Sequence, residues 1–437
     1  MAELIDLKEL EERVLLIAVN AGEEKETKAS LDELEELAQT AGAVPVARVI
    51  QNREAVHPGT YLGKGKLLEV REFLARTGAT GVICDDELSP AQLRNLEDVL
   101  ETKVMDRTMV ILDIFASRAH TREGKIQVEL AQLRYRAIRL VGMRNSLSRL
   151  GGGIGTRGPG EKKLETDRRL IHQRIGQLKR ELEDVKRHRE VTRQHREKNY
   201  GLTAAIVGYT NAGKSTLLNK LTGAGILAEN RLFATLDPTT RAFDLADGQQ
   251  ILMTDTVGFI RKLPHHLIDA FKSTLEEARY SDVILHVVDC SNPQMDMQMY
   301  VVKETLRELG IVDKTVVTVF NKIDRLDKEE GMGMLPRDFA SDYQVRISAK
   351  TGEGIEELEQ VLGSIIRSSR KTLAIQVSVS GQVTVRAPHT MPDSTIHRFL
   401  SQKESWILEH LSHAATEPAQ SPAENPPLSE FRRSYYM

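Results

Sequence analysis

Gly208, Gly213, Lys214 and Ser215 have the spacing of a phosphate-binding loop. They follow the apolar run TAAIV, which is typical of a buried strand, and they lead into TLLNKL, a helical pattern. In such a loop the glycines let backbone N–H groups surround the phosphates, the lysine reaches the β- and γ-phosphates, and the serine hydroxyl ligates Mg²⁺. The motif and its context together predict a nucleoside triphosphatase.

Three later motifs, each at the end of a predicted strand, identify the base. ILMTDTVGF leads into residues 255–258, which brings a carboxylate near the metal and a glycine N–H near the γ-phosphate. VVTVFNKID ends in residues 321–324, and VRISAK ends in residues 348–350. In GTPases the carboxylate at the position of Asp324 accepts hydrogen bonds from guanine N1 and N2, which adenine cannot supply in the same arrangement. The order of the four motifs predicts a GTPase.

The segment RLFATLDPTTR lies between the first two motifs and contains the expected first switch. Three of its residues could be the threonine that joins Mg²⁺ when the γ-phosphate is present: Thr235, Thr239 and Thr240. The residue after DTVG is Phe259, where Ras-like enzymes carry the glutamine that orients the attacking water. Phenylalanine cannot orient a water molecule, so we expect a partner to complete the catalytic site.

Two other glycine-rich segments resemble nucleotide sites only superficially. RLGGGIGTRGPGEKK, residues 149–163, contains the spacing G-x-G-x-x-G, but this follows a basic helical pattern rather than the strand that a dinucleotide-binding turn requires. GTYLGKGK, residues 59–66, has three residues instead of four before Gly63-Lys64, and a glycine follows the lysine. We interpret the first as the tip of an arm and the second as a flexible turn with exposed lysines.

Composition narrows the class of protein. A chain of 437 residues exceeds what one hydrophobic core usually serves, which predicts two to four domains. Cys84 and Cys290 are the only cysteines, the N-terminus is acidic, and no run approaches the roughly 18 uninterrupted apolar residues of a membrane span. These features predict a cytoplasmic protein without a membrane span.

The net charge of −3 conceals a strongly basic segment. Residues 131–160 contain six arginines, no lysine and no carboxylate, and residues 121–200 contain 21 Lys and Arg against 10 Asp and Glu. Such segregation of charge suggests a polyanionic partner, although a solvated helix face is the simpler alternative.

Periodicity predicts an α/β protein with several parts. Short β-rich runs alternate with helical patterns between residues 13 and 119, which indicates an open, mostly parallel sheet. Apolar residues then recur at three- and four-residue steps on both sides of the glycine-rich tip, which predicts an antiparallel helical hairpin. The expected domains are an N-terminal α/β domain (1–119), a basic helical hairpin (120–200), a doubly wound GTPase domain (201–371), a small C-terminal region (372–413) and a disordered tail (414–437).

Six segments of the chain together resemble the HflX branch of the translation-factor-related GTPases. They are the phosphate loop, FATLDPTTR, DTVG, NKID, the GKGK turn and the RLGGGIGTRGPGE tip. The resemblance covers roughly residues 10–370. It implies that Thr235 is the switch threonine, that Lys214, Thr235 and Gly258 are catalytic, and that Ser215, Thr235 and Asp255 hold Mg²⁺. The residues expected to contact the nucleotide are Gly208, Tyr209, Thr210, Asn211, Ala212, Gly213, Lys214, Ser215, Thr216, Phe233, Ala234, Thr235, Leu236, Asp237, Asp255, Thr256, Val257, Gly258, Asn321, Lys322, Ile323, Asp324, Ser348, Ala349 and Lys350.

The resemblance also implies a function and its partners. It implies a monomeric GTPase that binds GTP and GDP, contacts the large ribosomal subunit and its rRNA, and splits or rescues stalled ribosomes under stimulation by ribosomes. Asn211 occupies the position at which resembling GTPases that use K⁺ place an asparagine ligand. The main alternative is a GTP-switched RNA-binding scaffold in subunit assembly. A membrane-trafficking GTPase is disfavoured, since no lipidation signal or amphipathic basic terminus is present.

Overall fold

The computed structural model describes residues 11–147, 159–199, 202–223, 225, 232–245, 250–263, 275, 277–326, 338, 340–369, 374–377, 383–386, 399 and 403. Contacts divide the chain into two compact units, Met1–Glu359 and Gln360–Met437. The five domains expected from the sequence stay a prediction, because each of these units spans several of them.

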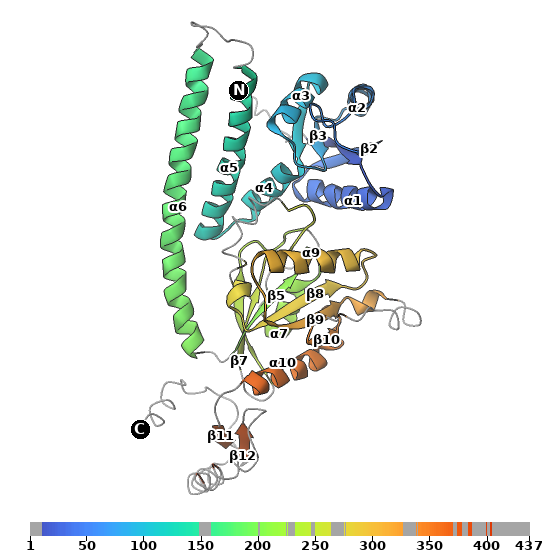
Figure 1. The fold of residues 1–437 in the computed structure, drawn as a ribbon. Coiled ribbons are helices and arrows are strands. Elements are labelled where there is room, and N and C mark those ends of the chain that lie inside the picture. Colours follow the sequence, from blue (N-terminus) through green and yellow to red (C-terminus); the bar gives the residue numbers. More distant parts are fainter. Residues whose placement is uncertain are drawn as a thin grey trace, which may run out of the picture. The chain divides into compact units, whose positions relative to one another are not determined.

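The first sheet is parallel and four-stranded, with the strand order β2-β1-β3-β4 (Figure 1). Its strands are β1 (Arg13–Asn20), β2 (Val44–Asn52), β3 (Gly81–Cys84) and β4 (Lys103–Asp106). The helices that follow them are α1 (Glu24–Thr40), α2 (Lys64–Thr77), α3 (Pro90–Leu100) and α4 (Arg107–Arg118). Because side chains alternate along a strand, Leu16 packs with α1 and α4, whereas Leu15 and Ile17 pack with α2 and α3.

Residues 59–66 do not form the flexible turn expected from their glycines. Gly63 is the N-cap of α2, which begins at Lys64, and Lys66 in the first helical turn pairs with Glu69 at 2.8 Å. The predicted turn is wrong from Lys64 onward, because the helix-favouring run KLLEVREFL outweighs the cost of one glycine. Lys64 itself is exposed, as predicted.

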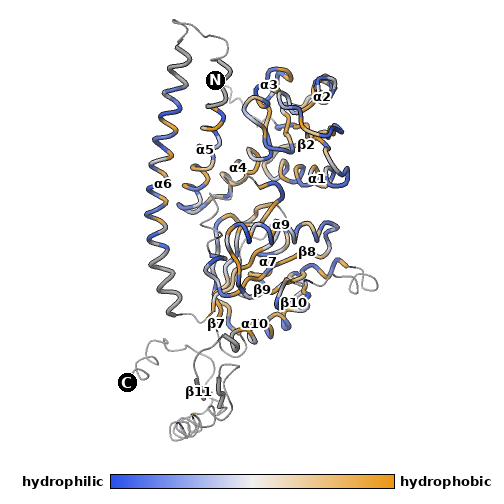
Figure 2. The backbone as a smooth tube through the Cα atoms, in the orientation of Figure 1, coloured by the Kyte–Doolittle hydropathy of each residue, from blue (hydrophilic) through white to orange (hydrophobic). Residues whose placement is uncertain are grey.

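The second sheet has six strands in the order β10-β9-β8-β5-β7-β6, all parallel except β6. Its strands are β5 (Leu202–Gly208), β6 (Thr239–Asp244), β7 (Gln250–Asp255), β8 (Val283–Asp289), β9 (Thr315–Asn321) and β10 (Tyr343–Arg346). Helices among and after these strands include α7 (Lys214–Thr222), the short 3₁₀ helix Ile323–Arg325, α9 (Met295–Glu308) and α10 (Ile355–Ser369). The predicted parallel sheet is confirmed, and Figure 2 shows hydrophobic residues along its central strands.

Helices α5 (Arg122–Leu147) and α6 (Pro159–Asn199) lie side by side (Figure 1). Their apolar positions, among them Leu130 and Leu178, form one buried cluster. Arg174 of α6 donates two hydrogen bonds, 2.8 and 3.0 Å long, to the Glu129 carboxylate of α5. The connection between the helices, residues 148–158, lies outside the described residues, so the hairpin and its glycine-rich tip stay predictions.

In the second unit, β11 (Ala374–Val377) pairs antiparallel with β12 (Val383–Arg386). Most of the small C-terminal region expected at residues 372–413, and the tail expected from residue 414, lie outside the described residues. No helix in the described part of the chain is long and apolar enough to cross a membrane.

Candidate active site

The phosphate-binding loop forms a pocket at the carboxyl end of β5. The pocket is lined by Thr210, Asn211, Gly213, Lys214, Ser215, Thr216, Phe233, Ala234, Thr235 and Gly258. Glycine is required at two of these positions. Gly213 has a φ of +96°, and a Cβ there would overlap the Asn321 amide nitrogen. A Cβ on Gly258 would lie 2.8 Å from the Thr210 methyl group and 3.0 Å from Lys214 Nζ, so the close approach of DTVG to the loop excludes larger residues.

Lys214 is buried in this pocket, and its side chain is held in place. Nζ donates a hydrogen bond of 2.8 Å to the Tyr209 carbonyl. Burial lowers the pKa of Lys214 to about 8, against the opposing effect of the nearby Asp255 carboxylate. Negative phosphate oxygens beside Nζ favour the charged form, so triphosphate binding compensates the cost of burying this ammonium.

Three oxygen-bearing side chains meet where the resemblance implies Mg²⁺. Ser215 Oγ donates to Asp255 Oδ2 at 2.6 Å and lies 2.8 Å from Thr235 Oγ1. The second oxygen, Asp255 Oδ1, is buried without a hydrogen-bond partner among the described residues. Burial raises the pKa of Asp255, and Lys214 lowers it in part. Hard oxygen donors with one unsatisfied carboxylate oxygen suit Mg²⁺, which would bind through Ser215, Thr235 and Asp255 and neutralise phosphate charge.

The NKID and SAK motifs lie together beside the loop. Asn321 donates to the Ala212 carbonyl at 2.8 Å and accepts from the Ala349 N–H at 2.9 Å, which ties both motifs to the phosphate-binding loop. Lys322 Nζ donates to the Asn211 carbonyl at 2.7 Å. Asp324 is exposed and accepts from the Ser348 hydroxyl at 2.6 Å, so its carboxylate is held where a guanine edge could reach it.

Some of the expected nucleotide contacts point away from the pocket. Leu236, Val257 and Ile323 are buried in hydrophobic clusters, and the Thr256 hydroxyl donates to the Ile206 carbonyl. The carboxylate of Asp237 contacts residues 120–121 instead of the pocket. Lys350 is exposed.

The three candidate switch threonines are also separated by the fold. Thr235 lies at Ser215 and Asp255, whereas Thr239 and Thr240 belong to β6, where the Thr240 hydroxyl lies 2.9 Å from that of Thr254.

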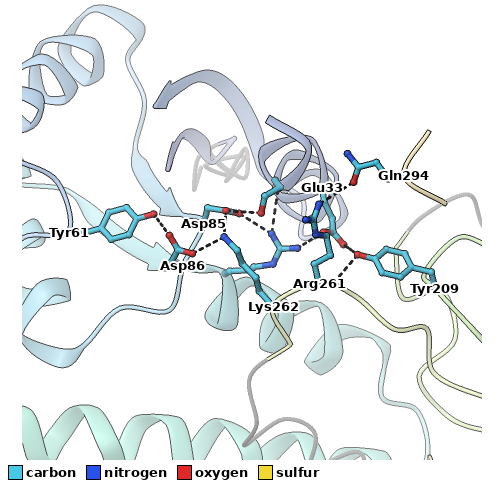
Figure 3. A network of polar contacts seen from close by, with 10 residues as sticks. Glu33, Tyr61, Asp85, Asp86, Tyr209, Arg261, Lys262 and Gln294 are labelled. Atoms are coloured by element: carbon cyan, nitrogen blue, oxygen red, sulfur yellow. Dashed lines mark hydrogen bonds and ion pairs between the residues drawn. The ribbon is translucent and has the colours of Figure 1, made fainter. Parts of the chain in front are cut away.

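The side chain of Tyr209 leaves the phosphate-binding loop and contacts α1 (Figure 3). Its hydroxyl donates to Glu33 at 2.7 Å and accepts from the Arg261 N–H at 2.8 Å. The backbone of Thr210 donates to the Phe259 carbonyl at 2.8 Å. These contacts join the loop, the segment after DTVG and the first helix of the chain.

An ionic network continues from Glu33 into the first sheet (Figure 3). The fully buried Arg107 donates to Glu33 at 2.7 Å and to Asp85 at 2.9 Å, and Lys262 pairs with both Asp85 and Asp86. Although burial raises it, Arg107 and Lys262 together hold the pKa of Asp85 below its ordinary value. Removing one member of such a buried network typically costs about 3–5 kcal/mol, because it leaves an uncompensated buried charge.

Sequence reasoning did not find this network. Asp85 and Asp86 directly follow the buried strand GVIC, and this acidic pair at a strand terminus was the one visible signal. No sequence signal marks Lys262 as a member of this network, because its partners lie more than 170 residues away in the sequence.

Comparisons with known proteins agree with this site. Residues 28–116, 118–196 and 203–322 match family models described as GTP-binding GTPase N-terminal, GTP-binding GTPase Middle Region and 50S ribosome-binding GTPase. The chain is 75% identical over 370 residues to the GTPase HflX of Lacrimispora saccharolytica, covering 85% of this chain and 86% of the relative. The chain belongs to the HflX family of GTPases. As an HflX GTPase, it is an enzyme that hydrolyses GTP.

More distant members of the HflX family align with most of the chain. The GTPase HflX of Escherichia coli is 46% identical over 360 residues, covering 82% of this chain and 84% of the relative. Among solved structures, a GTP-binding protein from Sulfolobus solfataricus in complex with GDP is 24% identical, covering 81% of this chain and 98% of that chain, with a TM-score of 0.43.

The C-terminal region matches a different family. Residues 371–434 match a family model described as YgjP-like, metallopeptidase domain. The sequence from residue 371 to 437 contains no His-Glu-x-x-His motif.

Proposed function

We propose that this HflX-family GTPase binds the large ribosomal subunit and its rRNA and acts in splitting or rescue of stalled ribosomes. The observation that carries the proposal is the union, in one chain, of a GTPase matched by the 50S ribosome-binding family model with a basic pair of long helices. Basic groups on an extended element suit phosphate-rich RNA, because neutralising phosphates releases counterions. We further propose that the protein acts in the cytoplasm as a monomer.

The structure refines which arginines could contact RNA. Arg139 of α5 is tied to Asp106 at 2.8 Å and stacks on the ring of Tyr135 at 4.0 Å, so it serves the fold. The run of arginines without a carboxylate suggested that Arg139 was free for RNA, but the carboxylate that pairs with it comes from another element of the fold. Arg136 on the same helix is exposed. Arg149 and Arg157 at the expected tip lie outside the described residues and are the arginines that we assign to RNA.

Replacing residues 151–158 with a neutral linker of the same length tests the proposal. We expect unchanged GTP affinity and basal hydrolysis but loss of GTP-dependent ribosome splitting, because the change leaves α5, α6 and the nucleotide pocket intact. The measurement is light scattering of intact ribosomes, with hydrolysis followed in parallel. If the variant splits ribosomes as well as the parent protein, the tip is only a connector.

Charge at the tip is tested separately from shape. Changing Arg149 and Arg157 to Gln should weaken ribosome binding and lower the slope of log affinity against log salt by about 0.7–0.9 per lost phosphate contact. Arg71→Gln, the same substitution at one exposed arginine of α2, is the control and should leave the slope unchanged.

We also propose that K⁺ assists hydrolysis at Asn211, which lines the phosphate pocket with a φ of +60°. A cation there would neutralise charge that develops in the transition state. Single-turnover hydrolysis should then be faster in KCl than in NaCl at equal ionic strength, and Asn211→Ala should remove the difference. Equal rates in the two salts, with and without ribosomes, would contradict this.

A further inference from the structure

The first switch contacts Ser215 of the phosphate-binding loop on one side, and α4 and the residues just before α5 on the other. On one side Thr235 lies 2.8 Å from Ser215 Oγ. On the other side the ring of Phe233 meets that of Phe115 in α4 edge-to-face, with the ring centroids 4.7 Å apart. Both rings are buried, and Leu236 belongs to the same hydrophobic cluster. The position of Thr235 therefore depends on contacts well outside the nucleotide pocket.

Asp237, two residues after Thr235, docks on the beginning of α5. Its Oδ2 accepts hydrogen bonds of 2.9 Å from the backbone N–H groups of His120 and Thr121, and its Oδ1 accepts from the Thr121 hydroxyl. Thr121 precedes the first residue of α5, and its Oγ1 accepts from the Gly124 N–H at 3.0 Å. The carboxylate satisfies two backbone N–H groups that precede the helix, and a negative charge near a helix N-terminus complements the helix dipole.

Gly124 is independent evidence that the chain has a specific place for the Asp237 carboxylate beside α5. It lies in the first turn of α5, where glycine costs about 1 kcal/mol relative to alanine. A Cβ at this position would overlap Asp237 Oδ1 and would lie 3.1 Å from Thr121 Oγ1. The approach of Asp237 therefore gives a physical reason for a glycine inside a helix.

We propose that Asp237 is a positioning residue for the GTP-bound state: it anchors the first switch to α5 and so holds Thr235 at the metal ligands. The switch threonine is needed when the γ-phosphate is present, so the anchor should favour GTP over GDP. Since α5 is one of the two basic helices, displacement of α5 by a partner and displacement of Thr235 become linked. That linkage rests on the proposed function, whereas the positioning of Thr235 does not.

The test compares two nucleotides on the isolated protein, without ribosomes. We expect Asp237→Ala to weaken binding of fluorescent GppNHp about tenfold in the presence of Mg²⁺, the scale of losing charge-assisted hydrogen bonds at a helix cap, with GDP affinity kept within about twofold. Asp237→Asn, which keeps one acceptor oxygen, should recover part of the loss. Asp244→Asn, an exposed carboxylate on β6, is the matched control and should change neither affinity.

Gly124→Ala provides a second test with opposite expectations. If Gly124 mattered only to the helix, alanine would stabilise α5 and leave nucleotide binding unchanged. Under the proposal, the added Cβ displaces Asp237, so GppNHp binding falls while GDP binding is kept. Equal losses for both nucleotides in Asp237→Ala, or no loss in either variant, would overturn the proposal. Failure of ribosome splitting would leave it standing, because the measurement contains no ribosomes.

Discussion

Replacing Asp324 with Asn is expected to move nucleotide preference from GTP to xanthosine triphosphate. The carboxylate would accept from guanine N1 and N2, whereas an amide would present a donor to the C2 carbonyl of xanthine. Asp324 is already oriented by the Ser348 hydroxyl at 2.6 Å, so the substitution changes the chemistry of a preset position. Hydrogen-bonding sites discriminate strongly because a mismatch leaves polar groups unpaired, and we expect a change of about 100-fold or more in the GTP to XTP affinity ratio.

Competition binding with labelled GDP measures this ratio directly. Asp296→Asn, the same change at an exposed position of α9, is the matched control. A variant at Asp324 that still favours GTP would show that residues 321–324 do not read the base.

The second large effect is the acceleration of hydrolysis by the large ribosomal subunit. Phe259 is 2% exposed and belongs to the hydrophobic core, and its backbone N–H donates to the Gly208 carbonyl at 3.1 Å. The residue after DTVG therefore offers no polar side chain to orient water. A site completed by a partner typically gains about 10³-fold or more, so slow turnover by the free protein should rise by that factor on large subunits.

Single-turnover hydrolysis with and without purified large subunits provides the measurement. Small subunits at the same concentration are the control for nonspecific RNA effects. Rapid turnover by the protein alone would contradict the inference from Phe259.

The sequence predicts those features of the fold and the site that depend on residues close together in the chain. The phosphate loop, DTVG, NKID and SAK are short segments at strand ends, and parallel strands bring their carboxyl ends together at one edge of a sheet. That rule is enough to place Lys214, Asp255 and Asn321 around one pocket. Periodicity likewise predicted the first parallel sheet, because buried strands and amphipathic helices are visible within a few residues.

The features that sequence could not give depend on distant partners. Tyr209 looks like a nucleotide contact, but its hydroxyl bonds to Glu33 in a helix 176 residues earlier. Asp237 looks like a nucleotide contact, but its carboxylate accepts from the backbone N–H groups of His120 and Thr121, just before α5. Arg139 looks like an RNA contact, but Asp106 neutralises it. In each case the local motif does not reveal which distant residue the side chain contacts.

We propose that GTP drives this protein to act on whole ribosomes. The most direct measurement is sedimentation of intact ribosomes after incubation with the protein and GTP, a non-hydrolysable analogue or GDP. We predict that GTP and the analogue convert intact ribosomes into subunits, with the protein on the large subunit, and that GDP does not. If intact ribosomes persist under GTP and the protein sediments only with incomplete subunits, the claim is wrong and a role as an assembly scaffold takes its place.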